Sequence, residues 1–291
     1  MSPDDATVGG GASAAPPAPT PAHAPAAGGL RPPRRYGAVN WLGLRTLMGR
    51  EIRRFLKVYT QTVAAPVMTT LLLLSVFALA LGGSTRAMAG RPFAEFLAPG
   101  LIIMAMVQNA FANTSSSLVI AKVQGNIVDS LMPPLSATEL TIGFAAGGVV
   151  RGLVVGAVVA LCLSPFVPLS AHAPLFIVFH GLMASLLLSL IGVAGGIWSD
   201  KFDHIAAVTN FVVTPLAFLS GTFYTVDRLP EPWHLVALLN PFFYMIDGFR
   251  YGFIGHHDSN LALGVAMMLG ANGALLWLCH RMFKTGYKLR P

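Results

Sequence analysis

Long stretches without a charged side chain constrain the fold of this chain more than any other feature of its sequence. Five such stretches lie between Lys57 and Arg86, Glu95 and Lys122, Arg151 and Asp200, Asp203 and Asp227, and Asp258 and Arg281. A helix needs about 20 mostly apolar residues to cross a bilayer. Only 11% of all residues are charged, whereas soluble domains average roughly 25%. The pattern predicts a membrane protein.

The number of membrane spans follows from the lengths of these stretches. The one between Arg151 and Asp200 is long enough for two helices, and the proline-containing segment SPFVPLSAHAP (164–174) divides it. We therefore predict an all-α membrane protein with about six transmembrane helices. The predicted spans are 58–83, 96–118, 139–163, 174–198, 204–224 and 260–281.

The net charge of +7 is explained by topology. Most basic residues precede the first span or follow the last, and the loop after the first span contains only Arg86 and Arg91. Because short cytoplasmic loops are enriched in Lys and Arg, both termini are expected in the cytoplasm, as an even number of spans requires. The basic residues then contact anionic membrane lipids, and no nucleic-acid partner is expected.

The chain divides into two parts by composition. Residues 1–37 are rich in Ala, Pro and Gly, and they predict a disordered cytoplasmic tail rather than a signal peptide, because no apolar core follows a basic start. Residues 38–291 are expected to form one transmembrane domain. Cys162 and Cys279 lie in predicted spans and belong to no CxxC or Cys/His ligand motif, so we predict neither a disulfide nor a metal site.

The segment 41–61 predicts an amphipathic helix. With about 100° of rotation per residue, its large apolar side chains share one face, and Arg50, Arg53, Arg54 and Lys57 share the other. Such a helix beside a span lies in the membrane interface with its cations toward the headgroups. The alternative is a helix packed on a soluble domain. We favour the interfacial helix because the sequence contains no such domain.

Two short cytoplasmic connections are candidate docking segments. By periodicity alone, 121–140 is a plain linker, although Ser136 and Glu139 have the spacing of a capping box at the start of the third span. The second connection, 198–207, is short and charged, and it fits a tight turn or a small docking surface.

The third span combines closely spaced glycines with a charge. Gly143, Gly147, Gly148, Gly152 and Gly156 recur at intervals that let helices approach closely in lipid. Arg151 lies near the middle of the span, where a charge costs at least about 2.5–3.5 kcal/mol, so it should face a partner or a water-filled pathway. The candidate partners are the polar residues of the second span, Gln108, Asn109 and Asn113.

The segment between the fifth and sixth spans lies on the external side by helix count. Its apolar runs are too short to cross a bilayer, and non-spanning backbone at membrane depth must be surrounded by protein or a water-filled cavity. We predict a helical hairpin that re-enters from outside and caps a central cavity, with Asp247 and Arg250 as a local ion pair. The hairpin and the segment before it include Phe223, Tyr224, Phe242, Phe243, Tyr244, Asp247 and Arg250.

Several motifs together carry a family resemblance. The segments LMPPLSATEL, PGLIIMAMVQNAFANTSSS and GGVVRGLVVGAVV, and above all LSGTFYTVDRLPEPWHLVALLNPFFYMIDGFRYGF, resemble the membrane subunits of type-2 ABC transporters. Within that family they are nearest to the YadH-like inner-membrane permeases. The resemblance covers about residues 40–290.

The resemblance implies a mechanism and partners. It implies an exporter permease of the bacterial inner membrane, in which two copies form the pathway and the hairpin is an external gate. It also implies a separate cytoplasmic ABC ATPase that binds ATP and magnesium, whereas this chain binds no cofactor and is not an enzyme. The implied ATPase-docking residues are Gln124, Gly125, Asn126, Asp129, Asp200 and Lys201. The implied pathway or intramembrane polar residues are Arg151, Asn109 and Asn113.

Several points on the pathway and cargo stay open. The pathway residues suit an amphipathic cargo, which could be a drug, a lipid or a lipid-linked glycan. The sequence contains no G-x-x-x-x-G-K-[ST] phosphate-binding loop. An ion-coupled secondary transporter is the alternative, but it would use several intramembrane carboxylates. An intramembrane enzyme would need a paired nucleophile and base or a metal-ligand motif, which the spans lack.

The topology can be tested by labelling. In a variant without the native cysteines, a cysteine at Thr225 or Asp258 should react with a membrane-impermeant maleimide added to intact cells. Labelling that occurs only after lysis would contradict the predicted orientation.

Overall fold

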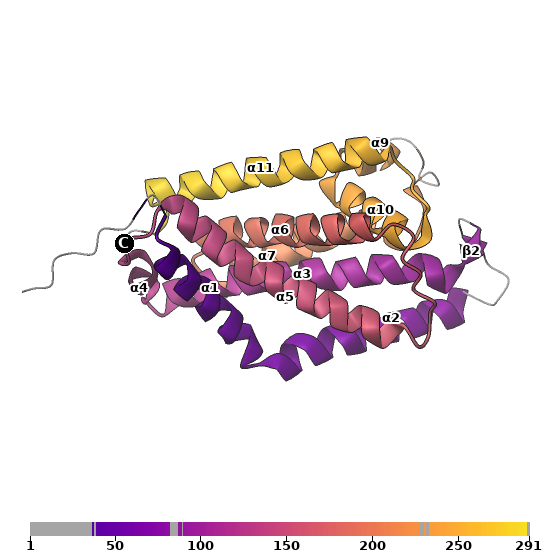
Figure 1. Cartoon of the computed structure of the whole chain (residues 1–291), viewed down its shortest axis with the longest axis horizontal. Coiled ribbons are helices and arrows are strands. Elements are labelled where there is room, and N and C mark those ends of the chain that lie inside the picture. The colour runs from indigo at the N-terminus through magenta and orange to yellow at the C-terminus, as the bar shows by residue number, and fades with distance from the viewer. Residues whose placement is uncertain are drawn as a thin grey trace, which may run out of the picture. The chain divides into compact units, whose positions relative to one another are not determined.

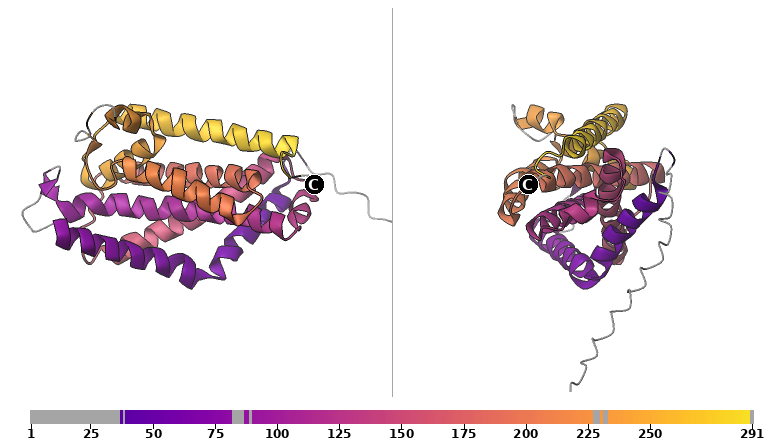
Figure 2. Two further views of the ribbon diagram at one scale, coloured as in Figure 1. Left: turned by 180° about the vertical axis from the view of Figure 1, so that it is seen from behind. Right: turned by 90° about the vertical axis from the view of Figure 1, so that its left-hand side faces the viewer.

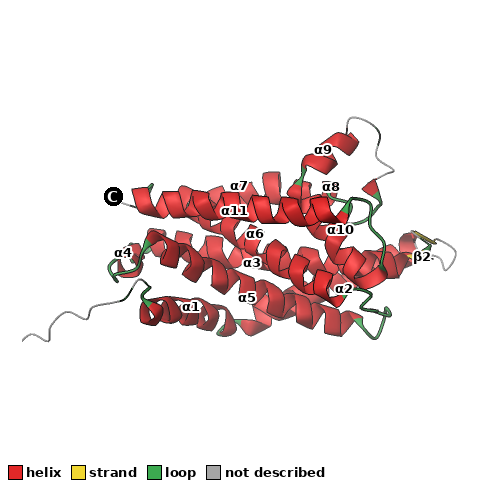
Figure 3. Ribbon diagram, turned by 45° about the horizontal axis from the view of Figure 1, so that its top comes forward, coloured by secondary structure: helices red, strands yellow, loops and turns green. Residues whose placement is uncertain are grey.

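The fold is almost entirely helical (Figure 3). The computed structural model describes residues 37, 39–81, 87–88, 90–226, 230 and 233–289, and all of these except residue 37 belong to the compact unit 38–291. In the described residues the only strands are β1 (Ala87–Met88) and β2 (Arg91–Pro92), which pair antiparallel.

Six helical segments in the described part of the chain are long and apolar enough to cross a membrane. They are η1–α2 (Thr60–Ala64, Ala65–Leu81), α3 (Phe93–Val123), α5 (Ala137–Leu163), α6 (Pro174–Trp198), α7–η2–α8 (Phe202–Val208, Thr209–Val213, Thr214–Leu219) and α11 (Leu261–Thr285). The shorter helices are α1 (Trp41–Leu56), α4 (Ile127–Leu131), α9 (Trp233–Leu239) and α10 (Pro241–Ile254). The predicted fold class, an all-α membrane protein with six spans, is confirmed.

The predicted C-terminal end of the fifth span was wrong. The prediction extended it to residue 224, but α8 ends at Leu219. Gly221 has a φ of +76°, which L side chains rarely adopt, and it turns the chain away from the helix axis. The preceding segment, α7–η2–α8, is correspondingly short for a span.

The helices connect at two ends of the bundle. One end holds α4, the start of α1 and the end of α11, and the opposite end holds β2, α9 and α10 (Figures 1 and 2). The helices α2 and α11 lie on opposite sides of α3 and α6 (Figure 1). This arrangement separates the two candidate docking connections from the predicted hairpin.

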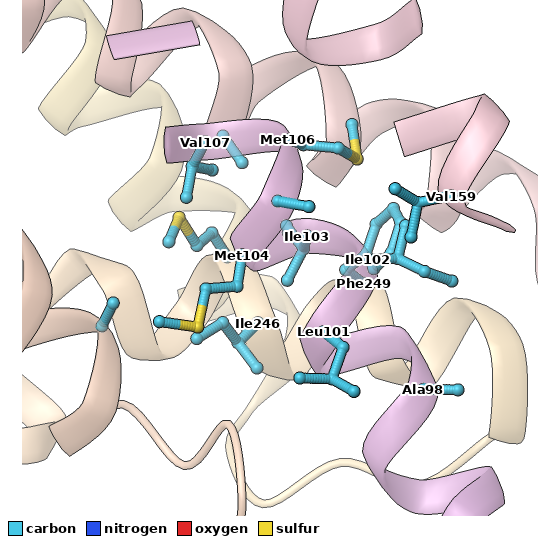
Figure 4. Packing of buried hydrophobic residues seen from close by; sticks show 14 of the residues in the cluster. Ala98, Leu101, Ile102, Ile103, Met104, Met106, Val107, Val159, Ile246 and Phe249 are labelled. Carbon is cyan, nitrogen blue, oxygen red and sulfur yellow. The ribbon is translucent and has the colours of Figure 1, made fainter. Parts of the chain in front are cut away.

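The helix α3 forms the centre of the bundle. In its most apolar 18-residue stretch, 83% of the residues are buried inside the protein. The buried share of the corresponding stretch is 17% in η1–α2 and 11% in α7–η2–α8. Its apolar side chains pack against α5 and α10, where Val159 and Phe249 meet Ile102 (Figure 4). The bundle is thus built around one buried helix, and the first and fifth spans cover it only in part.

The glycines of α5 allow close packing on two sides. A Cβ atom at Gly143 or Gly147 would collide with side chains of α1, and one at Gly148 or Gly152 would lie 2.8 or 3.0 Å from a carbonyl oxygen of α3. Two faces of the helix therefore depend on the absence of a side chain. This confirms the prediction that the repeat serves helix packing.

The first and fifth spans share a local irregularity. Each contains one turn of π-helix, η1 or η2, and in each a proline follows two residues after that turn, Pro66 or Pro215. The two segments are similar in sequence, TQTVAAP (60–66) and TNFVVTP (209–215). Because proline lacks the N–H that would bond four residues back, the regular ladder is interrupted, and a π turn is one way to accommodate the gap.

The close approach of α3 and α6 leads to a testable prediction at Gly192. A Cβ atom there would meet the Thr114 hydroxyl and lie 2.7 Å from the Phe111 carbonyl oxygen. Gly192→Ala should therefore destabilise the detergent-purified protein by about 1–3 kcal/mol, measured as a lower thermal midpoint. Gly270→Ala, which has no atom within 4 Å of the added methyl, is the matched control. Equal midpoints for both variants would contradict the close packing.

Candidate functional site

A groove opens along α3 between the first and fifth spans. The exposed or half-exposed residues of the middle of α3 are Gln108, Ala112 and Ser116, each four positions from the next. Residues at this spacing share one face of a helix. We call this face, together with Asn109, the α3 groove.

Two hollows meet in the α3 groove. One, of about 430 Å³, lies between α3 and α7–η2–α8, and the other, of about 390 Å³, lies between α3 and η1–α2. Gln108 and Asn109 line both hollows. The π turns border them too, since Gln61 of η1 lines one and Thr209 of η2 lines the other.

Arg151 reaches the α3 groove through Asn109. Its Nη2 donates a hydrogen bond of 2.9 Å to Asn109 Oδ1, which confirms Asn109 among the partners predicted for this arginine. The Asn109 amide nitrogen donates in turn to the Ala105 carbonyl at 3.0 Å, so the amide is held in one orientation. The Arg151 Nε is buried and has no hydrogen-bond acceptor in the described structure.

The helix α1 contributes a second arginine to the same region. Arg54 donates to the Asn113 carbonyl at 2.6 Å, to Asn113 Oδ1 at 3.1 Å and to the Ser116 hydroxyl at 3.3 Å. Asn113, predicted as a pathway residue, is fully buried and does not line either hollow. Ser116 lines the larger hollow.

The orientation of α1 differs from the sequence-based expectation. Arg53 and Lys57 are exposed, but Arg50 and Arg54 bind groups of the protein instead of pointing only outward. The buried face consists of Leu44, Leu47, Glu51 and Phe55. This face packs on the long helix α5, a surface that the amphipathic pattern did not reveal.

Glu51 organises these contacts, and the sequence analysis missed it. Its side chain is 1% exposed and lies between Arg50 and Arg54, with N–O distances of 3.2 and 3.3 Å. Arg50 also donates to the Ser130 hydroxyl of α4 at 2.9 Å. The available signal was its spacing, because Glu51 lies four positions from both Leu47 and Phe55.

The predicted docking residues are all exposed at the end of the bundle that holds α4. Gln124, Gly125, Asn126 and Asp129 are exposed on and before α4, and Asp200 and Lys201 are exposed in the turn between α6 and α7. We call these six residues the α4 surface. Lys122, at the end of α3 just before Gln124, joins the two parts of this surface by binding the turn that contains Asp200.

Lys122 connects the end of α3 to the turn after α6. Its ammonium donates to the carbonyls of Ile197 and Ser199 at 2.8 and 2.7 Å and pairs with Asp200 at 3.3 Å. Lys288 pairs with the other Asp200 oxygen at 2.9 Å. These hydrogen bonds from Lys288 and Lys122 hold the pKa of Asp200 below its usual range. The carboxylate therefore supports this turn above its ordinary pKa and stops doing so only as the pH falls through the lowered value.

The aromatic residues of the predicted hairpin are packed against the protein. Phe242, Phe243 and Tyr244 are buried in α10, and Phe223 stacks on Phe77 with ring centroids 4.9 Å apart. Tyr224 donates from its hydroxyl to the Leu219 carbonyl at 2.9 Å. Whether α9 and α10 re-enter a membrane stays a prediction.

The ion pair expected between Asp247 and Arg250 is wrong. Asp247 instead accepts hydrogen bonds from the backbone N–H groups of Asp258 and Ser259 at 2.8 and 3.0 Å and from the Ser259 hydroxyl at 2.6 Å. Arg250 donates to the Gly221 carbonyl at 2.6 Å. Side chains three positions apart thus bind two different loops instead of each other.

Arg250 also stacks on the central helix. Its guanidinium carbon lies 3.9 Å from the centre of the Phe96 ring of α3. Both carboxylate oxygens of Asp258 also have partners, His256 Nε2 at 2.8 Å and the Val226 N–H at 3.2 Å.

The role of Glu51 can be tested by proteolysis. Glu51→Gln leaves Arg50 and Arg54 without their counterion, so α1 should detach from α5 more often. Because proteolysis tracks the open population, we expect trypsin to cleave α1 about tenfold faster in inside-out vesicles, which corresponds to about 1.4 kcal/mol.

Glu95→Gln is the control for this experiment. Glu95 pairs with Arg91 at 3.4 Å in the segment around β2, and its substitution should leave cleavage of α1 unchanged. If Glu51→Gln were cleaved at the parental rate, Glu51 would not hold α1.

Comparison with known proteins places these features in a family. Residues 43–254 match the family profile described as "ABC-2 type transporter". The chain is 36% identical over 250 residues to the "Inner membrane transport permease YadH" of Escherichia coli (strain K12), which covers 86% of this chain and 98% of the relative. It is 22% identical over 237 residues to "Nodulation protein J" of Rhizobium leguminosarum bv. viciae, covering 80% of this chain and 89% of that protein.

Proposed function

Because the chain belongs to the ABC-2 type transporter family, we propose that two copies form an export pathway driven by a separate cytoplasmic ATPase. The family identifies the chain as a multi-pass inner-membrane permease subunit and thus as a transport subunit rather than an enzyme. The pairing, the direction, the cargo and the docking residues are our proposals. The α3 groove is the observation that carries them.

The α3 groove supports a pathway completed by a second copy. It exposes the amide of Gln108 and the hydroxyl of Ser116 on the face of the central helix that the first and fifth spans leave open. Polar groups at the middle of a membrane helix are costly against lipid. Two such grooves that face each other would enclose these groups in a shared passage, with lipid kept outside.

The α4 surface supports docking of an ATPase. Its exposed polar groups adjoin the apolar side chains of Val128 and Met132, which are 49% and 76% exposed. Such a mixture suits a protein partner better than bare solvent. The contact from Arg50 to Ser130 links this surface to α1. The partner ATPase would bind ATP and magnesium, for which this sequence has no phosphate-binding loop.

The acidic residues of the described spans argue against the ion-coupled alternative. Glu95, Glu139 and Asp203 all lie in the first turn of their helices, far from the positions a proton relay through the membrane would need. Glu139 is also committed to the predicted capping box, which the structure contains, and accepts the Asn40 N–H at 2.5 Å.

The cargo proposed for this pathway is amphipathic. The two hollows join apolar side chains such as Phe111, Val213 and Met104 to a few amide and hydroxyl groups. Within this class, a drug, a lipid and a lipid-linked glycan all combine an apolar part with a polar one. We propose the segment of α9 and α10 as the external gate, because Phe242 and Phe249 of α10 pack with residues of α3.

The ATPase proposal can be tested by co-purification from the native membrane. Asp129→Arg places a bulky cation at an exposed position of the α4 surface without touching the core. We expect it to reduce the recovered ATPase at least about tenfold, because charge reversal at an interface replaces attraction with repulsion.

Glu95→Arg makes the same charge change in the first turn of α3, at the end of that helix opposite α4, and should retain the ATPase. Quantitative mass spectrometry gives the ratio of the chains, which we expect to be one ATPase per permease. Undiminished recovery with Asp129→Arg would remove α4 from the docking surface, and purification without any ATPase after crosslinking would overturn the proposal.

A further inference from the structure

Two arginines from neighbouring helices bind residues on adjacent turns of α3, next to the α3 groove. Arg151 of α5 binds Asn109, and Arg54 of α1 binds Asn113 and Ser116. Asn109 and Asn113 are four positions apart, so their side chains lie on one face of α3, one turn from each other. Both guanidinium groups therefore lie beside the same stretch of α3.

The charge in this region is not balanced by the protein. The cations are Arg50, Arg54 and Arg151, and the carboxylate that contacts them is Glu51, which pairs with the first two. Among the residues that the structure describes, no acidic side chain lines either hollow. Within the described residues the region therefore carries an excess of positive charge, and a buried cation without an anion is costly.

An unsatisfied polar atom in this region is a donor. Arg151 Nε is buried without an acceptor in the described structure. Gln108 faces both hollows with an amide that can donate as well. Buried polar groups in proteins nearly always have partners. A donor without an acceptor, in a region with an excess of cations, favours the binding of an anion nearby.

The hollows also provide a place for an apolar chain. The walls beside Asn109 are formed by Phe111, Ile205 and Val213 on one side and by Leu73 and Met104 on the other. Their volumes of about 430 and 390 Å³ fall within the range of small-molecule sites, which is roughly 300–1,000 Å³. An apolar chain can lie along either wall while a polar group stays near α3.

We propose that the α3 groove binds an amphiphile with an anionic headgroup. The headgroup lies against Asn109 and Ser116, in the positive field of Arg151 and Arg54, and the apolar chain lies along the first or fifth span. This inference rests on the proposed function in one respect, which is that the bound amphiphile is the cargo. Binding itself requires neither the ATPase nor transport.

The test measures binding of defined probes to the purified full chain in dodecyl maltoside. The probes are dodecyl phosphate, which is anionic, glycerol monolaurate, which is neutral with a twelve-carbon chain, and inorganic phosphate. We expect dodecyl phosphate to bind about tenfold more tightly than glycerol monolaurate, as one charge-assisted contact would give. We expect no saturable binding of inorganic phosphate at millimolar concentration.

Two outcomes with the parental protein would overturn the proposal. Equal affinity for the two amphiphiles would remove the selectivity for an anion. Inorganic phosphate that binds as tightly as dodecyl phosphate would make the site one for free phosphate, with no role for the apolar chain. Because no ATPase is present, either result is distinct from a failure of the co-purification test.

Variants then locate the site. Arg151→Gln should reduce the preference for dodecyl phosphate to about twofold or less, whereas Arg151→Lys, which keeps the charge, should retain most of it. Arg54→Gln changes a side chain that is 31% exposed and tests the same site if Arg151→Gln does not fold. The proposal would be overturned if Arg54→Gln and Arg151→Gln both kept the full preference for dodecyl phosphate. It would also be overturned if Arg151→Gln misfolded and Arg54→Gln kept the full preference.

Arg281→Gln is the matched control. Arg281 lies on α11 over the Trp277 ring, with its guanidinium carbon 5.5 Å from the ring centre. Arg151 and Arg54 donate hydrogen bonds to Asn109 and Ser116 of the α3 groove, whereas Arg281 is placed on a different helix, away from these partners. This variant should keep the full preference. If it lost as much selectivity as Arg151→Gln, binding would follow the surface charge of the protein instead of the α3 groove.

Discussion

The need to satisfy polar side chains inside an apolar bundle governs the structure of this protein. Lipid offers no hydrogen-bond partners, so the polar residues of the central helix α3 must find them on neighbouring helices. Asn109 does so with Arg151 of α5, and Asn113 with Arg54 of α1. The Thr114 hydroxyl donates to the Ser189 carbonyl of α6 at 2.9 Å. Each contact sets the position of a different neighbour of α3.

The same contacts relate the proposed docking surface to the proposed pathway. A continuous series of interactions runs from Ser130 of α4 through Arg50, Glu51 and Arg54 of α1 to Ser116 of the α3 groove. At the opposite end, Arg250 and Asp247 fasten α10 to the loops beside it in a comparable way. The parts of the molecule with proposed roles at the two ends are thus attached to one helix. That helix is the least exposed of the six spans.

Sequence patterns predicted the local features well. They failed to predict the hydrogen-bond partners of side chains that contact residues distant in the sequence. The capping box at Ser136 and Glu139, the close packing of the α5 glycines and the contact of Arg151 with Asn109 were all predicted, because each follows from spacing or from the cost of a charge in lipid. The pair of Asp247 and Arg250 was predicted wrongly from proximity along the helix. Nearby backbone groups of two loops provided better partners than the pairing of the two side chains.

The sequence by itself determined the class of the protein, the number of its spans and the places where helices approach closely. These depend on composition and periodicity, which act over one helix at a time. Only the tertiary structure decided which face of α1 is buried, how Glu51 is neutralised and that Arg54 and Arg151 meet adjacent turns of α3. The physical reason is that these contacts join segments far apart in the chain. Their energies depend on the geometry of several helices together, which no single segment encodes.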